Sequence, residues 1–376
     1  MTPPPLALYV HVPWCVRKCP YCDFNSHVLS GDVPAAAWLA RIEADLDVEL
    51  AAAERPLTSI FIGGGTPSLL EAPTIEGLLA AVSARFELAS DAEITLEANP
   101  GTAEAERFAG YREAGVNRLS IGVQSFDDDA LARLGRIHGG AEARRAIDLA
   151  RAAGFERVNV DLMHGLPGQT AQAALADLDR ALDAGIRHLS WYQLTLEPNT
   201  VFHSRPPTLP VEDVLAEIED SGAERLRAAG LGRYEVSAWA EPGDESRHNL
   251  NYWRFGDYLG IGPGAHGKLT GTDGAVVRTR RTRSPKDWLD VAGGAPARNA
   301  STVAPDALPG EFMMNALRLV DGVEPALFEA RTGLALARIE GPLGSLRREG
   351  LLREDRLATT PLGLRFLDRV VGAFVA

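Results

Sequence analysis

The sequence contains very little cysteine, and this scarcity already excludes one class of protein. Its 376 residues include three cysteines, at positions 15, 19 and 22. Thiols so close together cannot link distant parts of a fold, so a secreted scaffold held by disulfides is excluded. A reducing cytoplasm is the compartment that this pattern predicts.

Long apolar runs, a leader sequence and an excess of positive charge are also missing. No apolar run reaches the roughly 18 residues that a membrane-spanning helix needs, and residues 1–5 lack the basic and apolar regions of a signal peptide. The net charge of -13, from 38 basic and 51 acidic residues, opposes non-specific binding to nucleic acid. We therefore expect neither a transmembrane segment nor a nucleic-acid partner, and peripheral membrane contact stays open.

Short apolar runs alternate with longer amphipathic segments over the first half of the chain. Because short buried strands that alternate with helices form parallel sheets of right-handed βαβ units, this pattern predicts an α/β fold with a barrel or partial barrel. In either form the C-terminal ends of the strands carry the functional residues. The six strands are expected at residues 6–12, 59–62, 93–98, 118–124, 157–163 and 188–194.

Further α/β elements are expected to extend these units toward the C-terminus. Residues 211–229 have the pattern of a helix and 233–238 that of a strand, whereas 248–268 is rich in glycine and aromatic residues and is expected to be irregular. Residues 293–309 resemble a linker, and the remainder predicts a small helical or winged-helix-like domain. The predicted division is a barrel domain at 1–240, an irregular extension at 241–300 and a C-terminal domain at 301–376.

Cys15, Cys19 and Cys22 form a C-x3-C-x2-C group for which three chemistries compete. Cys19 and Cys22 alone resemble a redox dithiol, but such a site uses only two cysteines. A zinc ion would take His11 or His27 as its fourth ligand, although structural zinc sites usually draw cysteine pairs from two segments. A 4Fe–4S cluster held by three thiolates would leave one iron open to a small molecule. The spacing of the cysteines and their position after the first strand favour the cluster.

The cysteine group, with Tyr21 between its second and third cysteines, resembles the signature of radical S-adenosylmethionine (SAM) proteins. The resemblance implies a partial (β/α)6 barrel in which Cys15, Cys19 and Cys22 bind a 4Fe–4S cluster. In that family the methionine end of SAM chelates the open iron, and one electron from the cluster cleaves SAM to a 5′-deoxyadenosyl radical. The cofactors supply the chemistry, and the protein supplies position and shielding.

A glycine-rich turn and several polar residues near strand ends agree with this resemblance. The turn at residues 63–67 follows the second strand, and glycines there allow a close approach of main chain and ligand. Polar residues in otherwise apolar strands are expected to face a cavity, because burying them without partners is costly. By the resemblance, the SAM-binding residues are Tyr9, Tyr21, Gly64, Gly65, Thr66, Glu97, Gln124, Arg136 and Asp161.

Three longer motifs resemble one group of this family, which contains the oxygen-independent coproporphyrinogen III oxidases and related heme chaperones. The motifs lie at residues 10–15, 22–27 and 251–262. The oxidases have a further cysteine where this chain has Phe24, and a long segment ahead of the first cluster cysteine, where this chain has 14 residues. The resemblance therefore implies a heme chaperone that passes heme to apo-hemoproteins. A coproporphyrinogen oxidase, or a radical SAM enzyme with another substrate, is the alternative, so whether the protein is an enzyme stays open.

A histidine in an H-N-x-x-Y-W motif is the heme ligand that the resemblance implies. The motif begins at His248, and His266 is a rival ligand, since an imidazole beside aromatic residues suits a porphyrin. The basic run at 278–283 could pair with heme propionates or with an acidic client, but a solvated edge strand is favoured. The expected partners are heme, apo-hemoprotein clients and an electron donor for the cluster, and homodimer formation stays open.

Overall fold

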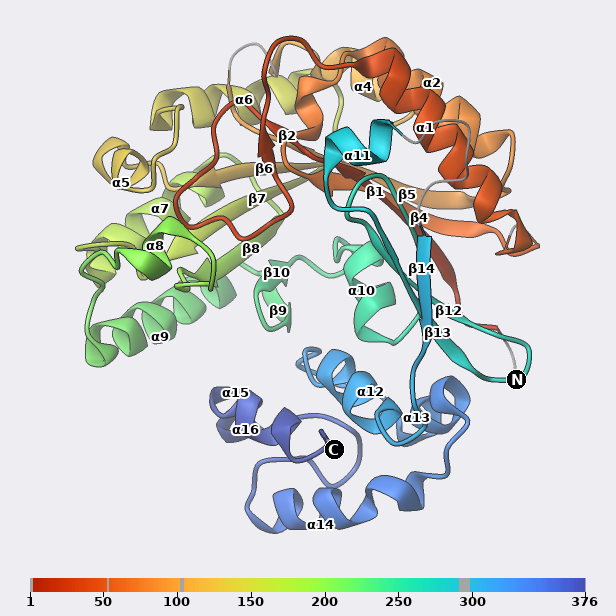
Figure 1. Ribbon diagram of the computed structural model, residues 1–376. Coiled ribbons are helices and arrows are strands. Elements are labelled where there is room, and N and C mark those ends of the chain that lie inside the picture. Colours follow the sequence, from red (N-terminus) through yellow and green to blue (C-terminus); the bar gives the residue numbers. More distant parts are fainter. Residues whose placement is uncertain (1–2, 53, 102–104, 291–297, 376) are drawn as a thin grey trace.

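The computed structural model describes residues 3–52, 54–101, 105–290 and 298–375. Figure 1 shows a curved sheet with helices along its outer face and a smaller helical domain set beside it. Within the described residues, the main sheet has twelve strands in the order β14-β13-β12-β11-β1-β4-β5-β6-β7-β8-β10-β9. The order places β1 in the interior of the sheet, between β4, which follows it closely in sequence, and β11, which begins at residue 257.

Six consecutive parallel strands form the centre of the sheet, as the apolar pattern predicts. Each pairs in parallel with the next along the sheet. Two of these strands begin earlier than the sequence pattern suggested, at Leu57 and at Leu88. The strands are β1 (Leu6–Val12), β4 (Leu57–Gly64), β5 (Leu88–Ala98), β6 (Arg118–Gln124), β7 (Arg157–His164) and β8 (His188–Gln193).

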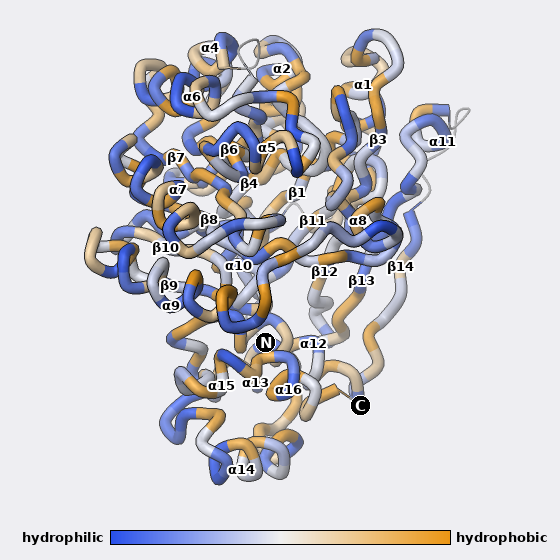
Figure 2. The backbone as a smooth tube through the Cα atoms, turned by 90° about the vertical axis from the view of Figure 1, so that its left-hand side faces the viewer, coloured by the Kyte–Doolittle hydropathy of each residue, from blue (hydrophilic) through white to orange (hydrophobic). Residues whose placement is uncertain are grey.

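The helices that follow these strands cover the outer face of the sheet (Figure 1). Figure 2 shows hydrophilic and hydrophobic residues alternating along them, as expected for helices that bury one side. Several of the turns that follow them place a glycine in the left-handed region, for example Gly154 at φ 84°, so the chain can reverse toward the next strand. The covering helices are α1 (Ala35–Val48), α2 (Ala72–Ser83), α4 (Phe108–Glu113), α6 (Gly140–Ala152), α7 (Ala171–Asp183) and α9 (Glu212–Ala228).

Shorter elements extend the sheet at both edges. At one edge, β9 (Gly232–Glu235) and β10 (Ala238–Ala240) add an antiparallel hairpin beside β8. At the other, β11 pairs in parallel with β1, and the next three strands follow antiparallel. These strands are β11 (Asp257–Ile261), β12 (His266–Thr270), β13 (Val276–Arg281) and β14 (Arg298–Thr302).

The expectation of irregular structure at 248–268 is wrong. This stretch contains most of α10 (Arg247–Trp253), all of β11 and the start of β12. The Ser246 hydroxyl accepts a hydrogen bond from the backbone N–H of Asn249 and so caps α10. The sequence pattern failed because the glycines and aromatic side chains lie in strands and a helix that are stabilised by contacts with distant segments.

The basic run at 278–283 is not an edge strand, contrary to expectation. Its residues up to Arg281 belong to β13, which lies between β12 and β14. The buried Arg281 side chain forms ion pairs with Asp45 (2.8 Å) and Glu49 (2.7 Å) of the α1 region. Because these acids lie more than two hundred positions away, no local pattern around Arg281 indicates them. The predicted linker at 293–309 likewise contains β14, and residues 293–297 lie outside the described residues.

The C-terminal residues form a small helical domain with its own apolar core, set beside the sheet in both views (Figures 1 and 2). Isolated antiparallel bridges, Val323 with Leu357 and Leu352 with Thr359, join the helices in the manner of a short wing. Its helices are α12 (Leu308–Ala316), α13 (Pro325–Thr332), α14 (Glu340–Arg348), α15 (Pro361–Arg365) and α16 (Leu367–Gly372). Among the described residues, no helix has both the length and the apolar character needed to cross a membrane.

The fold also contains two short strands and three short helices. A two-stranded parallel pair is formed by β2 (Trp14–Cys15) and β3 (His27–Val28). Three short helices are α5 (Asp128–Arg133), α8 (Val201–Ser204) and α11 (Pro285–Leu289). Together, β2 and β3 close the loop that contains the cysteines.

Candidate functional site

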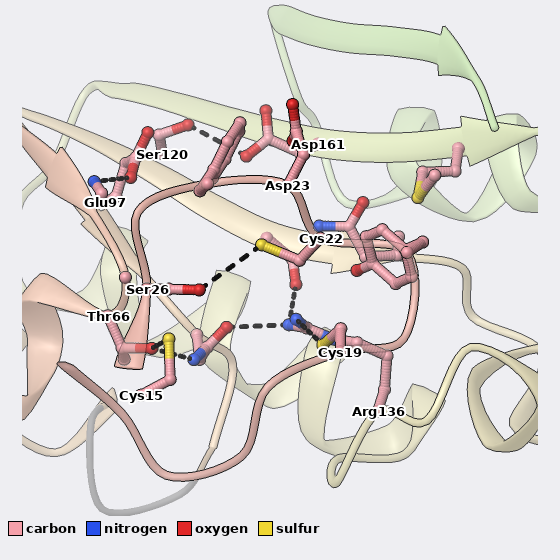
Figure 3. Close-up of a pocket in the computed structure, with 18 of the residues that line it drawn as sticks. Cys15, Cys19, Cys22, Asp23, Ser26, Thr66, Glu97, Ser120, Arg136 and Asp161 are labelled. Carbon is pink, nitrogen blue, oxygen red and sulfur yellow. Dashed lines mark hydrogen bonds between the residues drawn. The ribbon is translucent and has the colours of Figure 1, made fainter. Parts of the chain in front are cut away.

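The three cysteines lie on one loop that leaves the C-terminal end of β1. Cys15 ends β2, and the pairing of β2 with β3 brings the chain back beside it, with Leu29 N–H donating to the Cys15 carbonyl at 2.9 Å. Between them a turn is closed by a hydrogen bond from the Cys22 N–H to the Cys19 carbonyl (3.2 Å). All three thiols are free and line one cavity of about 480 Å³ (Figure 3).

Each cysteine sulfur has a hydrogen-bonding partner from the protein. Thr66 Oγ1 donates to Cys15 Sγ (3.4 Å), Arg136 Nη1 donates to Cys19 Sγ (3.6 Å), and Ser26 Oγ lies 3.7 Å from Cys22 Sγ. Figure 3 shows these contacts around the cavity. Burial raises the pKa of the Cys15 and Cys22 thiols, while the hydroxyl partners oppose that shift. A bound metal cluster would supply the positive charge that these thiols need in order to lose their protons.

The opposite wall of the cavity is built from the ends of the central strands. Glu97 is on β5, Gln124 ends β6, and Asp161 is on β7. The same cavity is lined by Tyr21, Gly64, Gly65, Thr66, Glu97, Gln124, Arg136 and Asp161. The structure therefore brings these residues, which the family resemblance grouped together, around one space with the cysteines.

The glycines of the turn at 63–67 are needed for packing between strands. A Cβ atom on Gly65 would lie 2.6 Å from the Trp14 carbonyl oxygen, and one on Gly64 would lie 2.6 Å from the His11 ring. The Gly65 N–H donates to the Val12 carbonyl (2.7 Å), and the Gly64 N–H donates to Glu97 Oε2 (2.9 Å). These glycines thus let the cysteine-bearing segment pass close to the end of β4, which sequence reasoning did not foresee.

Two half-buried carboxyl groups, those of Glu97 and Asp161, lie in the wall of the cavity. Burial raises the pKa of Glu97 to about 8, and the nearby Asp161 contributes to the rise. Burial also raises the pKa of Asp161, although hydrogen bonds from Asn159 Nδ2 (2.7 Å) and Ser120 Oγ (3.2 Å) favour its charged form. Such a pair would be stabilised by a cationic ligand. The ammonium and sulfonium groups of SAM meet this requirement.

Two residues of this wall, Asn99 and Tyr192, were not predicted from the sequence. Arg136 Nη2 is held by Asn99 Oδ1 (2.8 Å) and the Gly122 carbonyl (2.7 Å). The Tyr192 hydroxyl donates to Gln124 Oε1 (2.8 Å), and Gln124 itself adopts a positive φ of 70°, which is uncommon for a residue other than glycine. Asn99 and Tyr192 could have been found from the sequence as polar residues near strand ends.

Tyr9 and His248 lie outside this cavity. Tyr9 faces a second cavity, and its hydroxyl is 2.8 Å from His11 Nδ1. His248 is 1% exposed and lines neither cavity. Its ring nitrogens are engaged by Ser59 Oγ and the Tyr252 hydroxyl, each at 3.0 Å, and burial lowers its pKa to about 3, which keeps the ring neutral. Its role as a heme ligand therefore stays a prediction that would need both contacts to rearrange.

The comparisons with known proteins agree with this arrangement. A model of the Radical SAM superfamily matches residues 9–181, and a model of the HemN C-terminal domain matches residues 303–366. The chain is 51% identical to the heme chaperone HemW of Escherichia coli over 99% of both sequences. The chain belongs to the HemW family of radical SAM proteins. The HemW of Haemophilus influenzae is 47% identical over 99% of this chain and 98% of its own length.

A solved structure supports the fold. The coproporphyrinogen III oxidase HemN of Escherichia coli, a radical SAM enzyme, superposes with a TM-score of 0.83, covering 100% of this chain and 91% of HemN. At 23% identity, this likeness shows the fold alone. Membership of the HemW family implies a 4Fe–4S cluster and SAM, and the three thiols and two carboxyl groups of the cavity fit both groups chemically.

Proposed function

We propose that this protein is a heme chaperone that binds heme and transfers it to apo-hemoproteins, and that it carries a 4Fe–4S cluster ligated by SAM. The observation that carries the proposal is the likeness to HemW of Escherichia coli, at 51% identity over 99% of both chains. Clients, an electron donor, a cytoplasmic location and a homodimer stay predictions within this proposal.

The cysteines and their neighbours would hold the cluster. When bound, the cluster supplies an open iron for the methionine end of SAM and a source of one electron. Cys15, Cys19 and Cys22 would bind three of its irons through their thiolates. Thr66, Ser26 and Arg136 would direct hydrogen bonds at the sulfurs, a type of contact that tunes the reduction potential of iron–sulfur clusters.

The remaining wall residues would orient SAM. Glu97 and Asp161 would attract its ammonium and sulfonium groups, and the glycine turn would let its methionine end approach the backbone. Beside the cysteines, the Tyr21 ring packs against Phe202, with ring centroids 6.4 Å apart, and the Phe202 N–H donates to the Pro20 carbonyl (3.0 Å). This contact ties the cysteine loop to α8 and would limit the access of water to the cluster.

The alternative function is radical decarboxylation of a porphyrinogen. Its support is the fold shared with HemN, but Phe24, 60% exposed at the rim of the cavity, offers no thiol at that position. The hypotheses differ in what happens to the tetrapyrrole. A chaperone keeps it unchanged, whereas an oxidase converts it and consumes SAM.

One anaerobic preparation would separate the hypotheses. The cluster is reconstituted, iron and sulfide are measured, and the same protein is tested for heme transfer to an apo-hemoprotein and for turnover of coproporphyrinogen. We expect stable heme uptake and transfer without decarboxylation. Turnover of coproporphyrinogen with release of methionine and 5′-deoxyadenosine would overturn the proposal.

A further inference from the structure

A second cavity, of about 520 Å³, adjoins the cysteine cavity. The two share Asp23, Phe24, Gly64 and Glu97 in their walls. The remaining wall includes Tyr9, His11, Tyr252, Tyr258, His266 and Arg283. The volume falls within the range of roughly 300–1,000 Å³ that is typical of small-molecule sites. The cavity thus joins the central strands to the antiparallel extension at 257–302.

Aromatic side chains held in fixed positions line this cavity. The rings of Tyr252 and Tyr258 meet edge to face, with centroids 4.5 Å apart. The Tyr252 hydroxyl contacts His248 Nε2 (3.0 Å), and the Tyr258 hydroxyl accepts a hydrogen bond from Arg278 Nη1 (2.8 Å). With Phe24 at the junction of the two cavities, these rings form a wall suited to a flat, largely apolar ligand.

One imidazole in this wall is available to a metal. The His11 ring is hydrogen-bonded to the Tyr9 hydroxyl and to the Asn25 carbonyl. The buried His248 ring is hydrogen-bonded to Ser59 and Tyr252. The ring of His266, at the start of β12, is exposed and has no hydrogen-bond partner within the part of the chain that the structure describes. Burial and three nearby arginines lower the pKa of His266, which favours the neutral form that ligates metals.

Two arginines that form no ion pair within the described residues lie near His266. Arg283 lines the cavity, and Arg280 lies directly opposite His266 in the β12–β13 pair. Both are exposed, and neither forms an ion pair within the described residues, whereas Arg278 and Arg281 of the same run do. Guanidinium groups pair readily with carboxylates, so this edge suits an anionic group on the same flat ligand.

We propose that the second cavity is the heme site, with His266 as axial ligand to the iron and Arg283 as a partner of a heme propionate. The inference rests on the proposed function as a heme chaperone and names the residues that would hold its cargo. His248 then acts as a positioning residue, because its imidazole fixes the Tyr252 hydroxyl and so the aromatic wall.

Titration of the full-length, reconstituted protein with ferric heme tests the axial ligand. His266→Ala should weaken heme binding at least about tenfold and remove the absorption and electron paramagnetic resonance features of histidine ligation. Imidazole added to the solution should restore those features. The control His203→Ala, which removes another exposed histidine far from the cavity in sequence, should keep both the affinity and these features. His248→Ala, which frees the Tyr252 hydroxyl, should lower the affinity but keep the features of histidine ligation.

The outcomes distinguish this inference from the proposed function. Wild-type protein that takes up no heme would refute both. Wild-type protein that binds heme, with His266→Ala equal to it in affinity and spectrum, would overturn the assignment of His266 and leave the chaperone proposal standing. Loss of histidine ligation in His248→Ala but not in His266→Ala would overturn it as well.

A second pair of variants tests the propionate contact. Arg283→Gln should weaken heme binding about twofold to fivefold, as expected for an exposed ion pair. The control Lys286→Gln removes an equal charge three positions away, outside the cavity, and should leave affinity unchanged. Heme dimethyl ester, which lacks the propionate charges, should bind wild type and Arg283→Gln equally. A difference that persists with the ester would contradict the contact.

Discussion

The two neighbouring cavities are built from different kinds of sequence. The cysteine cavity combines one short motif with residues at the ends of consecutive parallel strands, and its parts follow one another along the chain. The second cavity takes Tyr9 and His11 from β1 but its other wall from residues 252–283, more than two hundred positions later. The first cavity is thus a property of the repeated βα unit. The second depends on how the extension folds back against β1.

Loss of a cysteine should have the largest effect, because it should abolish cluster binding in one cavity and leave heme binding in the other. Cys19→Ser is expected to abolish cluster assembly, because it leaves two thiolates where three are needed. Ferric heme should still bind, with a loss of no more than about fivefold, since that cavity contains none of the cysteines. Iron and sulfide analysis, beside a heme titration, measures both effects.

A neighbouring substitution controls for disturbance of the loop. Val16 is 52% exposed in the same loop, and Val16→Ser should assemble the cluster normally. If Cys19→Ser loses heme binding altogether, the two cavities form a single site and the comparison fails.

The charge of Glu97, on the wall that the cavities share, should control stability as a function of pH. Burial raises its pKa from 4.5 to about 8, so the folded protein keeps it protonated where the unfolded chain releases the proton. In cluster-free protein this effect should lower the free energy of unfolding by a few kcal/mol as pH rises from about 4.5 to 8. Glu97→Gln should remove that part of the decline, as urea unfolding across this range would show.

The exposed Glu76 of α2 provides the matched control. Glu76→Gln removes a carboxyl group from the surface and should leave the pH dependence as in wild type. Parallel stability curves for wild type and Glu97→Gln would contradict the burial of Glu97. Both wild type and Glu97→Gln retain the cysteines, so the contribution of cysteine titration cancels in the difference between their free energies of unfolding at each pH.

In the glycine turn at 63–67, a single added methyl group should lower the free energy of unfolding. Gly65→Ala places a Cβ 2.6 Å from the Trp14 carbonyl oxygen, a backbone atom, so the segment that leads to Cys15 must shift. We expect a loss of about 1–3 kcal/mol in the free energy of unfolding. Gly341→Ala in α14, where a Cβ meets nothing within 4 Å, should be neutral or stabilising. If Gly65→Ala and wild type were equally stable in urea unfolding, the segment that leads to Cys15 could move away from the turn without cost.

Sequence reasoning succeeded where information is local. The apolar runs predict all six central parallel strands, and the motifs group the cysteines with Gly64, Gly65 and Glu97, which line one cavity in the structure. The binding roles of these residues stay predictions. The family resemblance grouped them, and a physical rule explains why they meet, since the C-terminal ends of parallel strands lie at one edge of a sheet.

Sequence reasoning failed where partners are distant. The burial of Arg281 depends on Asp45 and Glu49, and His248 is held by Ser59, 189 positions away. No local pattern distinguishes a buried arginine with such partners from a solvated one. Composition likewise suggested irregular structure at 248–268, because glycines that permit close strand packing resemble loop glycines in sequence. At Gly260, for example, a Cβ would lie 2.0 Å from the His266 carbonyl oxygen.

The smallest expected effect concerns the link between the cavities. Asn25, in the cysteine loop, donates through Nδ2 to the Pro263 carbonyl (3.0 Å) and the Arg283 carbonyl (2.9 Å). These bonds connect the cysteine loop to the turn that precedes His266 and to the backbone of Arg283. Cluster assembly should therefore tighten heme binding by about fivefold in wild type, and Asn25→Ala should remove this difference between cluster-loaded and cluster-free protein.

The exposed Asn299 of β14 supplies the control, because Asn299→Ala removes an amide outside both cavities. It should keep the wild-type ratio of heme affinities. If Asn25→Ala also keeps that ratio, the cavities are neighbours without energetic coupling. If wild type itself shows equal affinities with and without the cluster, heme binding is independent of the cysteine loop, and SAM and heme would act in this protein as separate ligands of adjacent sites.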